Sequence, residues 1–423
     1  MILASATLHF VGWVEPISGY VGFRFTQPNL HFVSLIVQCE TQQWPILEPS
    51  PNFILSSTVM LEKKYRYIKI NKEYYQVKQN PLILAWYLTL SGRSFQLRSG
   101  KKKNRIIKCL LELILYQLHL RKHANAISVS APGNLCLRVH RGLKIFDFRR
   151  KIVRRIIDQE IDKATVLKEI NAVREAGRLN FTPNVMSWNI EEKWYEEDFI
   201  SGEPCFLSDQ SEEVDILKLF HKDIAPCLEQ MIFLQTPVAT DLREHVNKTT
   251  SIVKDQELSR STLDPKNIST IIRYLKTTAL PLVKKNTDRI NLVFSHGDYS
   301  LVNILRTKNG IKVIDWEGVD YRNPLYDLYN FFFTELYYKR AKTNLIMEIN
   351  EAILFMQTRL YTKFPDIAKS IELFASTYRK LYYIERICML LERDLSNQLL
   401  DVVLRSINVF ERYEKAVENR NSS

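Results

Sequence analysis

Three polar side chains with fixed spacing mark the stretch FSHGDYSLVNILRTKNGIKVIDWE (294–317). Asp298 is followed five residues later by Asn303, and Asp315 stands twelve residues beyond Asn303. Two short apolar segments lie between the last two, around an Asn-Gly pair (309–310). That pair suits the left-handed dihedral angles of a two-residue hairpin turn. The spacing therefore predicts a hairpin that folds Asp315 back toward Asn303.

The chemistry of these side chains predicts phosphoryl transfer. A hard cation such as Mg²⁺ prefers oxygen ligands and usually takes only one or two from protein. The amide of Asn303 and the carboxylate of Asp315, meeting at the base of the hairpin, suit such an ion. Asp298, one short loop earlier, is then free to orient or deprotonate an attacking hydroxyl.

The pattern H-G-D-x-x-x-x-N followed by I-D-W-E resembles the catalytic and metal-binding loops of the aminoglycoside phosphotransferase and choline kinase superfamily, relatives of the protein kinases. The resemblance implies that Asp298 is the catalytic aspartate, that Asn303 and Asp315 bind metal, and that ATP and Mg²⁺ are the cofactors. It also implies that Asp327, in the segment P-L-Y-D-L, braces the catalytic loop. Glu317 has two open roles, contact with a second metal or the acceptor, and bracing of the loop.

Composition limits the class of protein. The chain has 423 residues, 46% of them hydrophobic, which is enough for two or three domains with sizeable cores. Six scattered cysteines without a Cys-x-x-Cys pair predict reduced thiols and a cytoplasmic protein. The first residues make a poor signal peptide, and no window approaches the roughly 20 apolar residues of a membrane span. The formal charge of +12 favours an anionic partner, although the sequence lacks motifs typical of nucleic-acid binding.

Residues 1–130 predict an accessory domain of β or α/β character. Alternating apolar and polar residues indicate a strand at 30–38 and a hairpin formed by YRYIKI (65–70) and EYYQVKQ (73–79). A basic segment (99–105) then precedes a helix expected at 106–123. Two interpretations of 98–123 stay open, a solvated linker before a core-packed helix and a peripheral contact with a membrane surface.

Residues 131–200 resemble the small lobe of a kinase. Three strands are expected, LCLRV (135–139), LKIFDF (143–148) and KIVRRI (151–156), followed by a helix at 163–178. In the family, the third strand carries a cation that pairs with a glutamate of the helix.

The resemblance assigns this cation to Arg155, which shares a strand face with Val153, in preference to Arg154. It assigns the glutamate to Glu169, with Glu175 as second choice.

Two features depart from the family pattern. The turn His140-Arg141-Gly142 has one glycine, so two alternatives stay open: contact with the phosphates is weaker than in the family, or it falls to Arg141. In addition, arginine replaces the family lysine on the third strand. The acidic, aromatic segment 197–201 resembles the hinge between the lobes. The resemblance therefore places Glu197 and Phe199 beside the nucleotide base.

The remaining residues, 201–423, predict a helical large lobe. Helices are expected at 211–235 and 265–284, and a strand at 290–294 delivers the catalytic loop. No glycine follows Gly318, so the last hundred residues should be mostly helical.

The predicted fold is therefore α+β and protein-kinase-like, with a β-rich small lobe, a helical large lobe and an additional N-terminal domain. The predicted function is transfer of the γ-phosphate of ATP to a hydroxyl of a small molecule or carbohydrate. The sequence looks closest to little-characterised bacterial phosphotransferases linked with cell-surface polysaccharide synthesis. Two alternatives stay open, a pseudokinase-like nucleotide-binding regulator and a membrane-surface assembly factor.

Overall fold

The computed structural model describes residues 64–70, 73–84, 102–118, 126–205, 215–255, 264–284, 289–337, 345–393 and 397–421. By its contacts the chain divides into two compact units, Met1–Leu61 and Glu62–Ser423. The first unit lies outside the described residues, and so does the strand predicted at 30–38.

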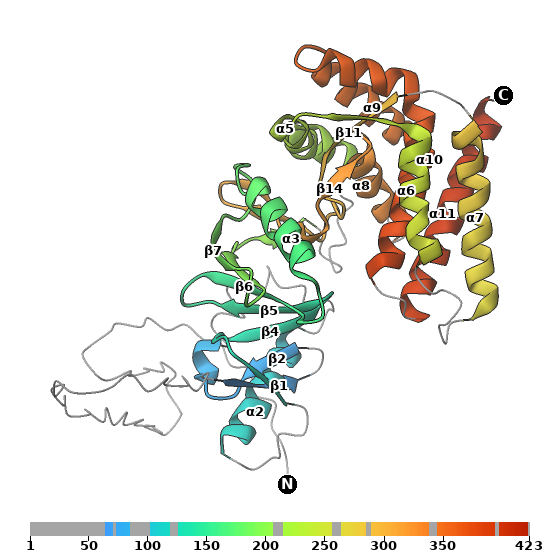
Figure 1. The fold of residues 1–423 in the computed structure, drawn as a ribbon. Helices are drawn as coiled ribbons and strands as arrows, with labels where there is room; N and C mark the ends of the chain where they lie inside the picture. The colour runs from blue at the N-terminus through green and yellow to red at the C-terminus, as the bar shows by residue number, and fades with distance from the viewer. Residues whose placement is uncertain are drawn as a thin grey trace, which may run out of the picture. The chain divides into compact units, whose positions relative to one another are not determined.

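Eight antiparallel strands form the main sheet, in the order β3-β1-β2-β4-β5-β6-β8-β7 (Figure 1). The strands are β1 (Tyr65–Ile70), β2 (Glu73–Gln76), β3 (Ala126–Val129), β4 (Leu135–Val139), β5 (Gly142–Asp147), β6 (Ile152–Ile157), β7 (Val185–Asn189) and β8 (Trp194–Asp198). In β6, buried Val153, Arg155 and Ile157 alternate with half-buried Arg154 and Ile156, which is the period of a strand. The strands predicted in 65–76 and 135–156 are confirmed.

Helices in this part of the chain include α2 (Lys102–Gln117) and α3 (Lys163–Ala176). Asp162 caps α3 by accepting a hydrogen bond from the Thr165 N–H at 2.9 Å. Val166, Ile170 and Val173 bury one face of α3, at helical spacing. α3 confirms the helix predicted at 163–178, whereas α2 begins at Lys102, inside the basic segment predicted to be a linker.

The main sheet runs without interruption across the predicted domain boundary at residue 130. Tyr75 of β2 is paired with Leu135 of β4, and Tyr74 is paired with Cys136. Side chains from both sides of the boundary also share their cores: Tyr67 lies in one cluster with Cys136. The division into three domains remains a prediction, and the described strands before residue 130 are hydrogen-bonded to those after it.

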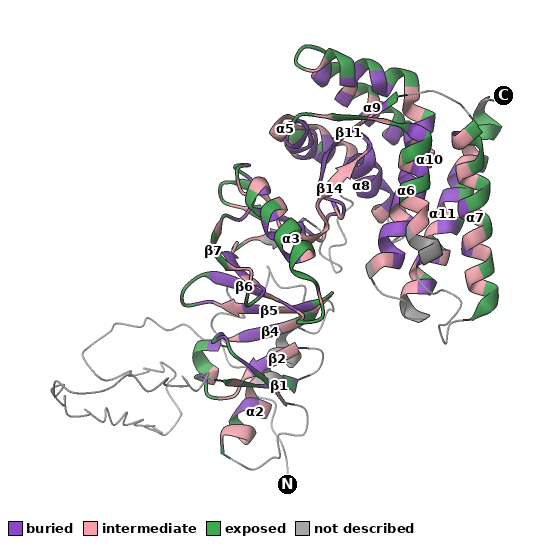
Figure 2. Ribbon diagram, in the orientation of Figure 1, coloured by how far each residue is buried: buried purple, intermediate pink, exposed green. Residues whose placement is uncertain are grey.

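The rest of the described chain is mostly helical. The helices are α4 (Ile216–Leu219), the π-helix η1 (Phe220–Ile224), α5 (Ala225–Leu234), α6 (Leu242–Asp255), α7 (Pro265–Lys284), α8 (Tyr326–Tyr337), α9 (Leu345–Tyr361), α10 (Pro365–Arg393) and α11 (Asn397–Asn421). The long α10 packs against α6, α7, α8, α9 and α11. Figure 2 shows exposed residues on the outer faces of α7 and α9. The predicted α+β class, with a β-rich part followed by a helical part, is confirmed.

Short strands within the helical part flank the loop that contains Asp298. They form two three-stranded sheets, in the orders β10-β11-β14 and β13-β12-β9. Their bounds are β9 (Glu203–Pro204), β10 (Val238–Asp241), β11 (Arg289–Ser295), β12 (Ile304–Thr307), β13 (Gly310–Val313) and β14 (Asp320–Arg322), with a 3-10 turn, η3, at Trp316–Gly318. The strand predicted at 290–294 is therefore confirmed.

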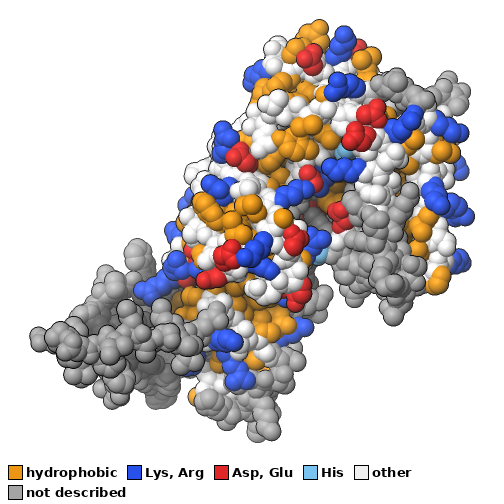
Figure 3. Space-filling model, viewed as in Figure 1, with side chains coloured by type: hydrophobic (Ala, Val, Ile, Leu, Met, Phe, Trp, Pro, Cys, Tyr) orange, Lys and Arg blue, Asp and Glu red, His pale blue; other side chains and the backbone are white. Residues whose placement is uncertain are grey.

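The described surface carries charges of both signs. On the face shown in Figure 3, Lys and Arg side chains are interspersed with Asp and Glu over the described surface. Among the described helices, none combines the length and the apolar composition that a membrane span requires.

The continuity of the sheet predicts that residues 62–130 are needed for stability. A fragment of residues 131–423 loses the pairing of β2 with β4 and the buried side chains Tyr67, Ile68 and Tyr75, each of which contributes about 1.5–3 kcal/mol. In urea titrations, this fragment should unfold at a markedly lower concentration than a fragment of residues 62–423. Equal midpoints would show that residues 62–130 do not stabilise the rest of the chain.

Candidate active site

The loop after β11 is held by a buried histidine. The His296 ring is fully buried, accepts the Asp298 N–H at Nδ1 (3.1 Å) and contacts the Ile314 carbonyl through Nε2 (3.0 Å). Burial lowers the pKa of His296, so the ring is neutral near pH 7. Because Nδ1 accepts a hydrogen bond, this network assigns the proton to Nε2, which donates it to the carbonyl. His296 thus connects the catalytic loop to the hairpin that follows it.

Asp327, at the start of α8, braces the same loop from the other side. Its carboxylate accepts hydrogen bonds from the backbone N–H groups of His296 (2.8 Å) and Gly297 (3.0 Å). Gly297 has φ +81°, and a Cβ there would lie 2.3 Å from the Gly318 carbonyl oxygen, so only glycine fits. The bracing role expected for Asp327 matches this geometry.

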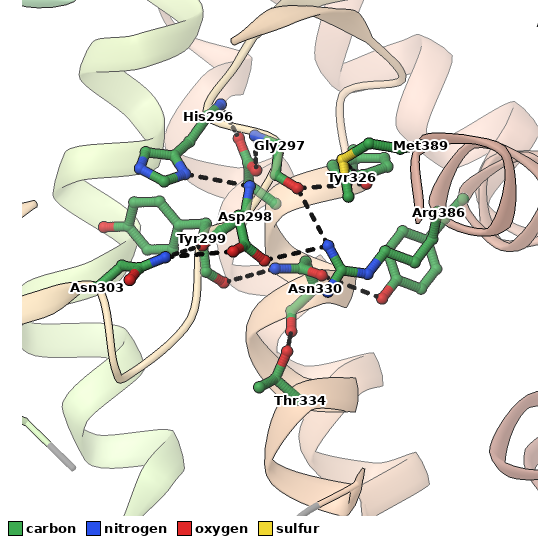
Figure 4. Close-up of polar contacts among 12 residues, drawn as sticks. His296, Gly297, Asp298, Tyr299, Asn303, Tyr326, Asn330, Thr334, Arg386 and Met389 are labelled. Carbon is green, nitrogen blue, oxygen red and sulfur yellow. Dashed lines mark hydrogen bonds and ion pairs between the residues drawn. The ribbon is translucent and has the colours of Figure 1, made fainter. Parts of the chain in front are cut away.

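Asp298 lies between Asn303 and Arg386 (Figure 4). The Asn303 Nδ2 group donates to the Asp298 carbonyl at 2.9 Å and approaches its Oδ2 at 3.4 Å. Arg386 Nη1 forms an ion pair with Asp298 Oδ1 at 3.1 Å. The sequence did not reveal Arg386, which lies on α10, 88 residues from Asp298. Its only local indication is a charged residue within the apolar run YYIERICMLL.

The hairpin brings Asn303 and Asp315 to the same end, as predicted. The Ile314 N–H donates to the Asn303 carbonyl at 2.9 Å, and Asp315 follows directly. The predicted turn is wrong in one detail: because Thr307 pairs with Gly310, Lys308 and Asn309 form the turn. Only Gly310 has a positive φ in the described hairpin, so Asn309 does not adopt the left-handed conformation.

The donor set at this end of the hairpin fits Mg²⁺. The side-chain oxygen of Asn303 and the carboxylate of Asp315 are the hard ligands that this ion prefers. The described residues contain no group of three or more His, Cys, Asp or Glu side chains arranged to hold a metal. Two protein ligands match the usual way in which Mg²⁺ is bound, with phosphates and water filling the remaining positions.

Arg155 lies beside Glu169, as the sequence suggested. Arg155 Nε is 3.5 Å from Glu169 Oε1, and Arg155 Nη2 is 3.0 Å from Glu317 Oε2. Arg154 points to the other face of the sheet, where it pairs with Glu196 at 2.7 Å. The structure thus separates the two arginines, and the role of Arg155 toward a nucleotide stays a prediction.

Lys144, on β5, is a site residue that the sequence analysis missed. Its ammonium group forms an ion pair with Asp315. Burial acts to lower the pKa of Lys144, but the carboxylates of Asp315 and Glu317 outweigh it and raise the pKa, so the side chain is charged. The pattern LKIFDF predicted the strand but not which residue of β6 faces Lys144.

Two other residues predicted to bind the nucleotide, Arg141 and Phe199, contact different parts of the protein. Arg141, in the β4–β5 turn, donates to the Glu392 carbonyl of α10 at 3.3 Å. The Phe199 ring packs against those of Phe146 and Phe148, with centroid distances of 6.4 and 5.5 Å. The structure therefore describes these side chains in contacts within the protein, and their contact with a nucleotide stays a prediction.

Glu197, at the end of β8, is buried among charges. Burial raises the pKa of Glu197 to about 7, with Lys144 opposing the shift and Asp315 adding to it. This carboxyl group therefore keeps its proton to a higher pH than an exposed glutamate does.

Comparisons with known proteins agree with the resemblance seen in the sequence. Residues 242–360 match the model of the phosphotransferase enzyme family, and this segment contains Asp298, Asn303, Asp315 and Asp327. Comparison with curated protein sequences gives no match.

Solved structures that resemble this chain at low identity include three phosphotransferases. A choline kinase from Cryptosporidium parvum is 16% identical, with 69% of this chain and 89% of that chain covered and a TM-score of 0.44. An ethanolamine kinase from Plasmodium vivax is 13% identical, with 65% of this chain and 80% of that chain covered and a TM-score of 0.44. The aminoglycoside phosphotransferase APH(4)-Ia, in a complex with ADP and hygromycin B, is 14% identical, with 66% of this chain and 91% of that chain covered and a TM-score of 0.43. The match of residues 242–360 to the phosphotransferase enzyme family confirms the predicted resemblance to this family.

The raised pKa of Glu197 predicts how pH affects stability. Between the unfolded pKa, near 4.5, and about 7, the folded protein keeps a proton that the unfolded chain loses. Stability should therefore fall as the pH rises from 5 to 8, by an amount on the order of 2 kcal/mol from this group. Glu197→Gln removes this contribution, so urea unfolding of the variant should depend less on pH than that of the wild type.

The matched control is Glu160→Gln, which changes an exposed glutamate. The prediction fails if Glu197→Gln and Glu160→Gln show the same change in unfolding free energy between pH 5 and pH 8.

Proposed function

We propose that the protein transfers the γ-phosphate of ATP to a hydroxyl group of a small molecule or carbohydrate. One observation carries the proposal: Asn303 is bonded through its side chain to Asp298 and through its carbonyl to Ile314, beside Asp315. Asn303 thus holds together the candidate base, Asp298, and the two candidate metal ligands, Asn303 itself and Asp315. The family match to residues 242–360 covers the same segment.

In the proposed reaction, Asp298 accepts or orients the proton of the acceptor hydroxyl as its oxygen bonds to the γ-phosphorus. The bond from the γ-phosphorus to the β,γ-bridging oxygen breaks, and ADP leaves. Asn303 and Asp315 would hold Mg²⁺, which supplies neutralising charge for the phosphates when bound. Most of the rate would come from positioning and electrostatics, because the transition state needs little covalent help.

The surroundings of Asp298 indicate the charge of the acceptor. Arg386 pairs with Asp298 and has a side chain that is 15% exposed. A cationic acceptor would have to approach this guanidinium, which costs electrostatic energy. Cationic substrates such as choline or an aminoglycoside are therefore disfavoured here, although similar structures include a choline kinase and a complex with hygromycin B. We infer a neutral or acidic hydroxylated acceptor, of which a carbohydrate is one class. The link with cell-surface polysaccharide synthesis stays a prediction.

One observation favours a nucleotide-binding regulator without turnover as the second candidate. The β4–β5 turn contains a single glycine, and its Arg141 is bonded to α10, so few backbone groups of the turn can cradle phosphates. The membrane-surface alternative, like the cytoplasmic location, stays a prediction, because only residues 102–118 of its segment are described.

Substitution of Asp298 should impair turnover, whereas substitution of Asp315 should impair nucleotide binding. In Asp298→Asn, Mg-ATP binding should stay within about threefold of the wild type, while turnover with an acceptor falls about 10²–10⁴-fold. In Asp315→Ala, Mg²⁺-dependent nucleotide binding should weaken about tenfold or more, because a metal ligand is lost. Calorimetry and a coupled ADP assay would measure these changes.

The control is Asp366→Asn, an exposed position in the first turn of α10. Nucleotide binding by the wild type without turnover, over a broad acceptor screen, would favour the regulator. Full turnover in Asp298→Asn would exclude Asp298 as the base.

The inferred acceptor class can be tested with the same ADP assay. Neutral and acidic sugars should stimulate turnover more than choline or an aminoglycoside. Arg386→Gln should lower kcat/KM for an acidic acceptor about tenfold more than for a neutral one, since an attractive charge is removed. The matched control is Arg412→Gln, an exposed position on α11. A cationic acceptor that gives the highest kcat/KM would contradict the inference.

A further inference from the structure

Two cations of the sheet lie side by side and reach the same short segment. In the antiparallel register of β5 and β6, Lys144 is directly opposite Arg155, so both side chains project from one face. Lys144 forms an ion pair with Asp315, whereas Arg155 Nη2 is 3.0 Å from Glu317 Oε2. The two cations therefore have different partners within the I-D-W-E segment.

Arg155 is enclosed by protein on every side of its guanidinium. The side chain is 1% exposed, and Nη2 also donates to the His140 carbonyl. Nε faces Glu169 at 3.5 Å, and a Cβ added at Gly142 would lie 2.9 Å from Nη1. Nε and Nη1 are buried without a hydrogen-bond acceptor among the described residues, and a side chain that is 1% exposed offers no nitrogen to a phosphate arriving from solvent.

Lys144 is enclosed less completely than Arg155, with a side chain that is 12% exposed. Among the described residues, its ammonium group has one ion-pair partner, Asp315, whose side chain is 35% exposed. An ammonium carries three N–H donors, so donors remain for a further anion. Because Asp315 is a candidate metal ligand, a phosphate held by that metal would come within reach of Lys144. The compact ammonium suits such an oxygen as a point charge.

We infer that Lys144, rather than Arg155, donates to the phosphate oxygens of a bound nucleoside di- or triphosphate. This inference rests on the proposed function and deepens it by naming the phosphate ligand. Arg155 is then a positioning residue: it ties Glu317, the His140 turn and α3 together. The phosphate-binding cation, which the family resemblance assigned to β6, then lies on the neighbouring strand β5.

The test is equilibrium binding of Mg-ADP and of adenosine, measured by calorimetry. Lys144→Met keeps the unbranched shape of the side chain and removes its charge. It should weaken Mg-ADP binding about tenfold or more while adenosine binding stays within about twofold, because adenosine has no phosphate. Lys144→Arg should fall between the wild type and Lys144→Met. The control is Lys69→Met, an exposed position on β1 of the same sheet, and thermal melts would verify folding.

Arg155 supplies the second half of the test. Arg155→Lys should keep the ratio of Mg-ADP to adenosine affinity within about threefold of the wild type, while its melting temperature falls. The inference is overturned if this ratio drops in Arg155→Lys and not in Lys144→Met. It is also overturned if Lys144→Met binds Mg-ADP more tightly, because Lys144 would then only compete with the metal for Asp315.

The same binding measurements distinguish this inference from the proposed function. If the wild-type protein binds no Mg-nucleotide, both the proposed function and the role of Lys144 are wrong. If the wild type binds Mg-ADP and Lys144→Met binds it equally well, only the role of Lys144 is wrong.

Discussion

A cluster of unequal charge surrounds Asp315, whose side chain is 35% exposed, while the other members are largely buried. It contains the cations Lys144 and Arg155 and the carboxylates Glu169, Glu197, Asp315 and Glu317. Burying charge is costly unless each group is paired, and here four carboxylates share two cations. Glu197 relieves part of the excess because burial raises its pKa to about 7. A divalent cation at Asp315 would relieve more, so the electrostatics and the oxygen ligands favour the same occupant.

The same cluster connects the sheet to the helical part of the chain. Lys144 and Arg155 extend from β5 and β6, Glu169 lies on α3, and Asp315 follows the β12–β13 hairpin. These ion pairs join elements that are far apart in sequence. A change in the β5–β6 register by one residue would turn one of the two cations to the other face, away from its carboxylate partners. The register of two strands is therefore a condition for the site.

The sequence predicted what local patterns determine. The spacing of Asp298, Asn303 and Asp315, together with apolar periodicity, was sufficient for the loop, the hairpin and most of the helices. It was insufficient for contacts set by pairing between strands or by packing of distant helices. Lys144 depends on the register of β5 against β6, and Arg386 lies 88 residues from its partner. Neither relation leaves a periodic pattern in the chain.

The predicted position of the turn near residue 309 was wrong for a different reason. An Asn-Gly pair is common at the centre of a two-residue hairpin, but the pairing of Thr307 with Gly310 moved the turn one residue earlier. The hydroxyl of Thr307 accepts the Asn309 N–H at 3.1 Å and donates to the Gly310 carbonyl at 2.8 Å, which stabilises that register. Side-chain hydrogen bonds of this kind compete with simple turn preferences.

The backbone at Asp315 connects these features to function. Asp315 has φ 74° and ψ 50°, a left-handed conformation that costs about 1–2 kcal/mol for a residue with a Cβ. Its neighbours hold it there: Ile314 is bonded to His296 and Asn303, and the Trp316 indole N–H donates to the last carbonyl of β13 at 2.8 Å. The tryptophan of the I-D-W-E motif is thus an anchor for the aspartate before it. A backbone fixed in this way holds Asp315 at the base of the hairpin beside Asn303, which suits a reaction that depends on positioning.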